Sequence, residues 1–247
     1  HTPTMTTVTP HPLASKYEFL TISILTKNPH VVLVSLNRPH KRNAINANMW
    51  REIGNAFRLL GTLGDGCRCI LLSGSGKSFC GGIDTTDVSF FPSQDEQGDT
   101  TRRALSFRSQ ILEMQDCFTA VEQCSVPVVA AIHGSCIGAA IDLACCADVR
   151  LCAPCTIFSI REVRLGLAAD VGTLQRLPKI VGHDSRVREL CLTGQDFDAR
   201  EGARIGFVSR ISATENDLLP MAIHVCERIA RNSPVAVAGT KQSLNYS

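Results

Sequence analysis

A continuous apolar segment, residues 128–132, constrains the fold of this chain more than any other feature of its sequence. A strand that is apolar at every position has to be covered on both faces, as in a parallel sheet enclosed by helices. His133 and Gly134 follow it, and a helix of small residues then ends near Cys146. Because other apolar strands and helical patterns alternate along the chain, we predict an α/β fold.

Hydrophobic periodicity predicts the remaining elements. Asn46 has the side chain of a helix cap, and Met49, Ile53 and Phe57 follow it on one helical face. A turn at Lys27-Asn28-Pro29 separates two predicted strands. We expect strands at residues 19–25, 31–36, 69–72, 148–152 and 207–211, a long helix at 101–123, and mostly helices after 172.

The length of 247 residues and a hydrophobic content of 44% suit one large core. Residues 1–16 are rich in Thr and Pro and contain no acid, so we expect a disordered segment, with a weak signal for targeting. We predict an α/β core over residues 17–195 and a C-terminal helical region over 196–247. The polar, turn-rich residues 84–100 are expected to be mobile.

Charge and cysteine usage exclude several functions. The net charge is +2 and the basic residues are scattered, so no nucleic-acid partner is expected. No apolar run approaches the roughly 20 residues that span a bilayer. The 12 cysteines include several in apolar runs, which is typical of a reducing compartment. Cys152 and Cys155 form a Cys-x-x-Cys without a second pair, so we predict no metal site.

Two glycine-rich segments are candidate sites for an anion. Residues 76–84 follow a predicted strand, and residues 134–142 open a predicted helix. Two backbone N–H groups meeting there would form an oxyanion hole for a carbonyl group, although each segment alone is more often an ordinary turn. Residues 76–84 are not a phosphate loop, because Leu71 stands where that motif needs glycine.

Three carboxylates are candidate acid–base groups, and each also has an ordinary explanation. Asp142 lies in an apolar helix, where a buried carboxylate is costly unless it is paired or used; it could also satisfy first-turn amides. Asp170 precedes a helical pattern and could be a simple N-cap. Glu162, between Arg161 and Arg164, could be a surface ion pair. Taken singly, these residues decide nothing.

Read together, these segments resemble the enoyl-CoA hydratase/isomerase (crotonase) superfamily over about residues 17 to 245. That resemblance implies a crotonase-like spiral of repeated ββα units with a C-terminal helical region. It also implies a fatty-acid β-oxidation enzyme that acts on an acyl-CoA. The matching segments are residues 36–39, 41–46, 79–84, 127–134, 137–142, 158–162 and 166–177.

Within the superfamily, the chain is most similar to the dienoyl-CoA isomerases, which move a 3,5-diene to the 2,4 position. Hydratases of the family usually carry glutamate at both main acid–base positions, where this chain has Asp142 and Glu162. They also carry glycine in place of Asp170, and an aspartate there distinguishes the isomerases. The chain departs from the family at Ala139 and Ala140, which are often glycine, and at Arg164, which is often acidic in the isomerases and which we expect to point to solvent.

The resemblance also implies roles for these residues. Glu162 would be the base at C2, Asp170 the acid at C6, and Asp142 would hold Glu162. The N–H groups of Gly81 and Ala139 would bind the thioester carbonyl. No cofactor is expected beyond the CoA of the substrate. Lys41, Arg42 and Ala44 would lie near the CoA nucleotide and Gly82, Ile83 and Asp84 along the pantetheine, although Lys41 and Arg42 could equally be a solvated basic pair.

Family members form trimers or dimers of trimers through C-terminal helices, so we expect a homotrimer or a dimer of trimers. This chain stops earlier than the family normally does, so we expect the C-terminal region to be incomplete. The expected compartment is the mitochondrion or a peroxisome-like organelle. Two alternatives stay open: a 2-enoyl-CoA hydratase that uses Glu162 and Asp142 on a bound water, and a non-catalytic RNA-binding or scaffold protein.

Overall fold

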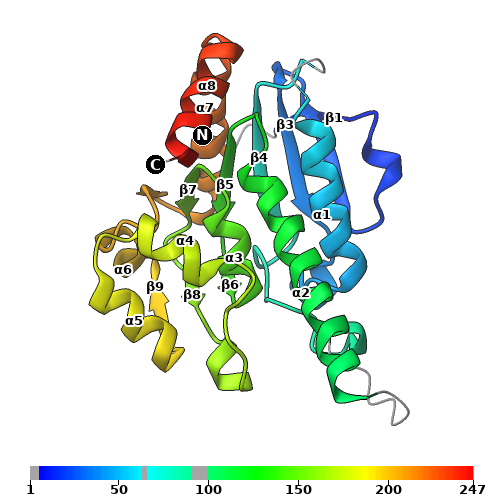
Figure 1. Cartoon of the computed structure of the whole chain (residues 1–247). Coiled ribbons are helices and arrows are strands. Elements are labelled where there is room, and N and C mark those ends of the chain that lie inside the picture. Colours follow the sequence, from blue (N-terminus) through cyan, green and yellow to red (C-terminus); the bar gives the residue numbers. More distant parts are fainter. Residues whose placement is uncertain (1–5, 63–65, 91–98, 247) are drawn as a thin grey trace.

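The computed structural model describes residues 6–62, 66–90 and 99–246. A seven-stranded sheet forms the centre of the molecule (Figure 1), in the order β1-β2-β3-β4-β5-β7-β10. The pairs β1–β2 and β2–β3 are antiparallel, and every later pair is parallel. The strands are β1 (Val8–Pro10), β2 (Leu20–Leu25), β3 (Asn28–Leu36), β4 (Cys69–Gly74), β5 (Val128–Ile132), β7 (Val149–Cys152) and β10 (Arg210–Ile211).

Helices cover both faces of this sheet, as the apolar segment predicted. Along β5, Val128 and Ala130 belong to one buried cluster, while Val129 and Ala131 belong to another on the opposite face. The first cluster includes α1 (Ala47–Leu60), α2 (Thr100–Glu122) and α3 (Ala139–Cys145), and the second includes α7 (Glu215–Ala230). The prediction of an α/β fold with a strand covered on both faces is confirmed.

A second sheet lies next to α3 and has three strands, in the order β6-β8-β9. Its strands have three residues each: β6 (Ser135–Ile137), β8 (Ile157–Ser159) and β9 (Asp196–Asp198). The sequence predicts none of these three strands, because such short strands show too few positions for a period to appear. The other helices include the 3-10 turn η5 (Glu162–Leu165), α4 (Thr173–Ile180), α5 (Asp184–Thr193), α6 (Ala199–Arg204) and α8 (Pro234–Tyr246).

The N-terminal part differs from the expectation of disorder over residues 1–16. Val8–Pro10 forms β1 against β2, and Ala14–Lys16 forms the 3-10 turn η1, while residues 1–5 lie outside the described residues. The predicted turn also shifts: Leu25 pairs with Asn28, so Pro29 lies inside β3. Proline is tolerated there because β3 pairs with β4 only from Val31 onward.

The stretch expected to be mobile, residues 84–100, is described only in part. Residues 91–98 lie outside the described residues, Val88–Phe90 forms the 3-10 turn η4, and Asp99 caps α2 by accepting the Thr101 N–H at 2.7 Å.

The cysteines behave as small buried hydrophobic residues, as predicted. Each is a free thiol, and all except Cys155 are buried. Within the described ranges, no group of three or more His, Cys, Asp or Glu side chains is placed to hold a metal ion. Among the helices of the described part of the chain, none is both long enough and apolar enough to cross a bilayer.

Candidate active site

A largely apolar cavity of about 510 Å³ lies between α2, the residues after β4, and the segment that joins β8 to α4. Figure 1 shows that α2 and this segment come from distant parts of the chain. The middle of α2 contributes Phe107, Ile111 and Met114 to the wall. The apolar lining consists of Trp50, Phe90, Phe107, Ile111, Met114, Leu165 and Leu167.

Glu162, the first residue of η5, presents its carboxylate to this cavity. Both carboxylate oxygens are buried, and neither has a hydrogen-bond partner among the described residues. Burial, and then the negative charges of Asp142 and Asp170, raise the pKa of Glu162 to about 7. A carboxylate that can take a proton near neutral pH and is held by no partner is suited to act as a base.

Asp142 lies behind the cavity, in the first turn of α3, and is completely buried. Its Oδ1 accepts the N–H of Thr173, the first residue of α4, at 2.5 Å, while Oδ2 has no partner among the described residues. Burial raises the pKa of Asp142 to about 6, opposed by Thr173 and Arg176 and assisted by Asp170. Asp142 therefore supports the neighbouring groups from behind the cavity wall.

Asp170 lines the cavity directly, just before α4. Its backbone is fixed, because its N–H donates to the Ala168 carbonyl at 2.9 Å and its carbonyl accepts the Gln115 side-chain amide at 2.6 Å. The N-cap of α4 is Gly172. The simple capping explanation of Asp170 thus does not hold, since Asp142 takes the first N–H of that helix.

Two backbone N–H groups without an acceptor meet at the same wall. Ala139 is the first residue of α3, and Ile83 follows Gly82; neither N–H has an acceptor among the described residues. Gly82 has φ +100°, and a Cβ there would lie 2.8 Å from the Ile137 carbonyl oxygen and 4.0 Å from the Ala139 nitrogen. Only a glycine allows the two segments to approach this closely.

The glycine at 138 brings Glu162 to the same point. A Cβ at Gly138 would lie 3.5 Å from Glu162 Oε1 and 4.0 Å from the Gly82 Cα. The unbonded carboxylate and the two N–H groups therefore converge on one part of the cavity. This arrangement can bind a carbonyl oxygen beside a base, which is the geometry of an oxyanion hole.

The structure corrects the prediction for Gly81. Its N–H donates to the Arg42 carbonyl at 2.8 Å, so this proton is already used within the protein. Ile83, which the sequence analysis placed along the pantetheine, has the available N–H instead. A parallel bridge with Ile45 orients it, because the Ile45 N–H donates to Gly82 and the Asp84 N–H donates to Ile45, each at 2.8 Å.

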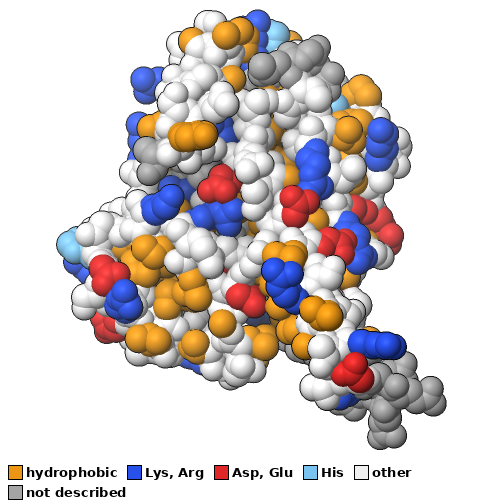
Figure 2. All heavy atoms as spheres, in the orientation of Figure 1, with side chains coloured by type: hydrophobic (Ala, Val, Ile, Leu, Met, Phe, Trp, Pro, Cys, Tyr) orange, Lys and Arg blue, Asp and Glu red, His pale blue; other side chains and the backbone are white. Residues whose placement is uncertain are grey.

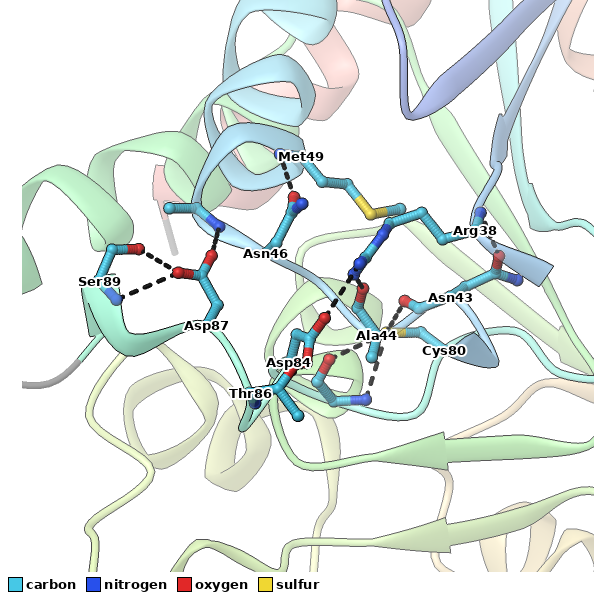
Figure 3. A network of polar contacts seen from close by, with 12 residues as sticks. Arg38, Asn43, Ala44, Asn46, Met49, Cys80, Asp84, Thr86, Asp87 and Ser89 are labelled. Carbon is cyan, nitrogen blue, oxygen red and sulfur yellow. Dashed lines mark hydrogen bonds and ion pairs between the residues drawn. The ribbon is translucent and has the colours of Figure 1, made fainter. Parts of the chain in front are cut away.

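Asp84 differs from its predicted place along the CoA. Its carboxylate is buried in an ion pair with Arg38 at 3.0 Å and accepts two hydrogen bonds from Thr86 (Figure 3). The Thr86 hydroxyl, opposed by burial and assisted by Arg38, lowers the pKa of Asp84 to about 2. Asp84 does not line the cavity, and its carboxylate anchors the loop that carries Ile83.

Asn43 fixes the other side of this loop. It is fully buried with φ +56°, and its side-chain amide donates to the carbonyls of Ser75 and Ser78 at 2.8 Å. Its Oδ1 accepts the Arg38 N–H at 2.8 Å (Figure 3). Neither Arg38 nor Asn43 was singled out in the sequence, because Asp84, Ser75 and Ser78 lie more than 30 residues away from them in the chain.

The predicted nucleotide-binding residues lie outside the cavity. Lys41 and Arg42 are exposed, and Arg42 has φ +51°. The Ala44 carbonyl accepts a hydrogen bond from Arg38. Arg164 is exposed at the cavity, in agreement with the expectation that it points to solvent.

Comparison with known proteins places this site in context. The sequence model of the enoyl-CoA hydratase/isomerase family matches residues 26–247. The mitochondrial Delta(3,5)-Delta(2,4)-dienoyl-CoA isomerase of Mus musculus is 42% identical over 233 residues, which are 94% of this chain and 71% of that protein. The peroxisomal isomerase of the same name from Arabidopsis thaliana is 40% identical, covering 92% of this chain and 82% of that protein.

A solved structure from Thermobifida fusca, in complex with acetoacetyl-CoA, has the same fold. It superposes with a TM-score of 0.79 at 28% identity and covers 95% of this chain and 89% of its own.

Proposed function

Since the chain belongs to the enoyl-CoA hydratase/isomerase family, we propose that it converts a 3,5-dienoyl-CoA into a 2,4-dienoyl-CoA in fatty-acid β-oxidation. The Mus musculus and Arabidopsis thaliana relatives, which carry this activity in their names, are 42% and 40% identical to it. Their names also include mitochondrial and peroxisomal, so the compartment is mitochondrial or peroxisomal, as predicted.

The observation that supports this reaction is that two separate carboxylates, Glu162 and Asp170, line one cavity. The reaction removes a proton from C2 and adds a proton at C6, which is four carbons away. One group cannot serve both carbons without moving, whereas two fixed groups can. We assign Glu162 as the base at C2 and Asp170 as the acid at C6.

The charge that develops in this reaction falls on the thioester oxygen. When the C2 proton leaves, the electron pair of the C–H bond enters a conjugated enolate that ends at this oxygen. The unbonded N–H groups of Ile83 and Ala139 are placed to donate hydrogen bonds to this oxygen. A single donor of this kind typically contributes about 10²–10³-fold in kcat. Protonation at C6 then returns the electron pair to a C–H bond and leaves the double bonds at C2 and C4.

Acyl-CoA is the substrate class, and the only cofactor we propose is the CoA of the substrate itself. Gly82 and Ile83 line the cavity where the pantetheine would enter. We assign the nucleotide end to the exposed Lys41 and Arg42 with Ala44. The proposal for the nucleotide is tested by Lys41→Ala and Arg42→Ala, which should raise KM for the acyl-CoA and leave kcat unchanged.

The proposed assembly is a homotrimer or a dimer of trimers. Apolar side chains are exposed over α4, α5 and η5, where Figure 2 shows a hydrophobic surface, including Leu165, Leu174 and Leu192. Exposed apolar patches of this kind typically mark an interface. Light scattering of the purified chain should give the mass of three or six copies, and a monomer would contradict the assignment.

Hydration of a 2-enoyl-CoA is less well supported by the geometry. That reaction needs two carboxylates on one water in the cavity, whereas Asp142 lies behind the wall with its Oδ1 on the Thr173 N–H. A non-catalytic RNA-binding or scaffold role has no basic surface to support it, since the net charge is +2.

The substitution Asp170→Asn tests the assignment. It removes the acid but keeps the size of the side chain, so turnover of a 3,5-dienoyl-CoA should fall by about 10²–10⁴-fold. The thermal melting curve and the binding of CoA should stay as in the wild type. Asp116→Asn on the exposed face of α2 is the matched control and should keep full activity. Near-normal turnover by the Asp170→Asn variant would show that this residue is not the acid.

A further inference from the structure

Arg176, in α4, lies behind the active site and is mostly buried, with 14% of its side chain exposed. Its Nη2 donates to the Thr119 hydroxyl at 3.1 Å and to Glu122 Oε2 at 2.8 Å, both on α2. Its Nε is buried and has no acceptor in the part of the chain that the structure describes. The ion pair with Glu122 uses only the Nη2 edge of the guanidinium.

Gly172 brings this guanidinium to Asp142. A Cβ at Gly172 would overlap Arg176 Nη1, and the same Cβ would lie 4.0 Å from Asp142 Oδ1. The backbone at Gly172 has φ +141°, a value that residues with a side chain rarely adopt. Arg176 thus passes Gly172 on the side that faces Asp142, the carboxylate that holds the start of α4, without forming an ion pair with it.

We propose that Arg176 is a positioning residue that keeps Asp142 ionised and thereby controls the protonation of Glu162. This inference rests on the proposed function, because it concerns the carboxylates assigned to the reaction. Arg176 does not line the acyl cavity. It lines a separate polar cavity of about 430 Å³ with Glu122, Gln175 and Lys179, so it acts on the chemistry without touching the substrate.

Among the described groups that act on Asp142, Arg176 is the cation. Asp170 and Glu162 add negative charge only when they are ionised, and the carboxylate of Glu122 on α2 opposes part of the effect of Arg176. Thiols also surround Asp142, but burial raises their pKa values far enough to keep them neutral near pH 7. These thiols are Cys136, Cys145, Cys146 and Cys191.

The sign of the effect follows from the charge. Asp142 and Glu162 interact, so they lose their protons as a coupled pair. A nearby cation lowers the pH at which both are ionised, and removing it raises that pH, whichever residue holds the last proton. Burial opposes the charge on Arg176, but the hydrogen bond with Glu122 and the nearby charges raise its pKa, so the guanidinium stays protonated throughout.

Three variants test this inference through the pH profile of kcat/KM. The active form in this proposal has both Asp142 and Glu162 ionised, so Arg176→Gln should move the acid limb of kcat/KM to higher pH by about one unit. Below the limb, kcat/KM should therefore fall about tenfold, with KM unchanged. Arg176→Lys keeps the charge and should keep the limb near its wild-type position. Glu122→Gln keeps an acceptor for Arg176 but removes the opposing charge, so the limb should move to lower pH.

A purely structural role would not give opposite shifts for Arg176→Gln and Glu122→Gln, since both changes weaken the same contact. An unchanged profile in Arg176→Gln, or a shift of both variants in one direction, would overturn the inference. If Arg176→Gln does not fold, as judged by its melting curve, the Lys and Glu122 variants still decide it.

A second readout does not depend on turnover. Nuclear magnetic resonance of protein labelled with ¹³C at the aspartate carboxyl carbons follows the titration of Asp142, whose signal is identified by its loss in Asp142→Asn. The signal should titrate at higher pH in Arg176→Gln than in the wild type. Absence of dienoyl-CoA turnover in the wild type would refute the proposed function, whereas an unshifted titration would refute the role of Arg176 alone.

Discussion

Glu162 carries two buried carboxylate oxygens without a partner among the described residues, beside a second buried carboxylate. A protein selected only for stability would pair or replace such a group, since an unpaired buried charge is costly. Its persistence at a cavity wall, opposite two unbonded N–H groups, is therefore best explained by chemistry.

The pKa of Glu162 predicts the pH dependence of turnover. The base must be ionised to take the C2 proton, and burial with the charge of Asp142 raises its pKa to about 7. We expect kcat/KM to fall as the pH drops below about 7, and Glu162→Gln to lose activity at every pH. A profile that stays flat down to pH 5 would contradict the assignment of Glu162 as the base.

The same shift predicts a change of stability with pH. The folded pKa of about 7 lies above the ordinary value of 4.5, so between these values the folded state binds more protons than the unfolded state. The free energy of unfolding therefore falls as the pH rises through this window. Glu162→Gln removes this penalty and should melt at a higher temperature than the wild type at pH 8.

The matched comparison for that melting experiment is Glu189→Gln on the exposed surface of α5, where no such gain is expected. A melting temperature of Glu162→Gln that falls relative to that of the wild type as the pH rises from 5 to 8 would contradict the predicted sign.

The sequence identified the residues of the site better than their contacts. Glu162 and Asp170 line the cavity as expected, and Asp142 was correctly expected to be buried. The prediction assigned the available N–H to Gly81 instead of Ile83. Which N–H of this loop points into the cavity depends on the bridge between Ile83 and Ile45. Contacts between residues far apart in the chain leave no local pattern in the sequence.

At the scale of elements, the loop that carries the Ile83 N–H is held by the buried ion pair of Arg38 and Asp84. The two side chains are only 10% and 7% exposed. Arg38→Met leaves Asp84 charged, buried and unpaired, so the free energy of unfolding should fall by about 3–5 kcal/mol. Activity should fall as well, because the loop then holds the N–H less firmly.

Urea unfolding measures this loss, and the double variant Arg38→Met/Asp84→Leu is its control. The double variant contains no unpaired charge and should regain most of the stability. If the double variant is as unstable as the single one, the packing of Arg38 and not its charge supports the loop.

Elements with a clear period were predicted within a residue or two, and the others were not. The helix expected at residues 101–123 is Thr100–Glu122, and the Asn46 cap accepts the Met49 N–H at 2.8 Å. The strand expected at 207–211 is reduced to Arg210–Ile211, where pairing with β7 begins. Sheet pairing decides such strand limits, and a strand's own sequence does not contain its partner.

At the scale of the whole molecule, the order of the elements brings segments from distant parts of the chain to one cavity. The segment after β4 supplies Ile83, the start of α3 supplies Ala139, and the connection from β8 to α4 supplies Glu162 and Asp170. The helix α2 closes the apolar side. The class of fold followed from one apolar strand, but this convergence depends on the full topology.

Conversion of a 3,5-dienoyl-CoA by the purified wild-type chain tests the central claim most directly. The two proton positions at Glu162 and Asp170 predict that the absorbance of the conjugated 2,4-dienoyl thioester grows with time, while crotonyl-CoA supplied in parallel keeps its enoyl absorbance. Loss of the enoyl absorbance of crotonyl-CoA, with no change in the 3,5-dienoyl-CoA, would contradict the account and identify a hydratase.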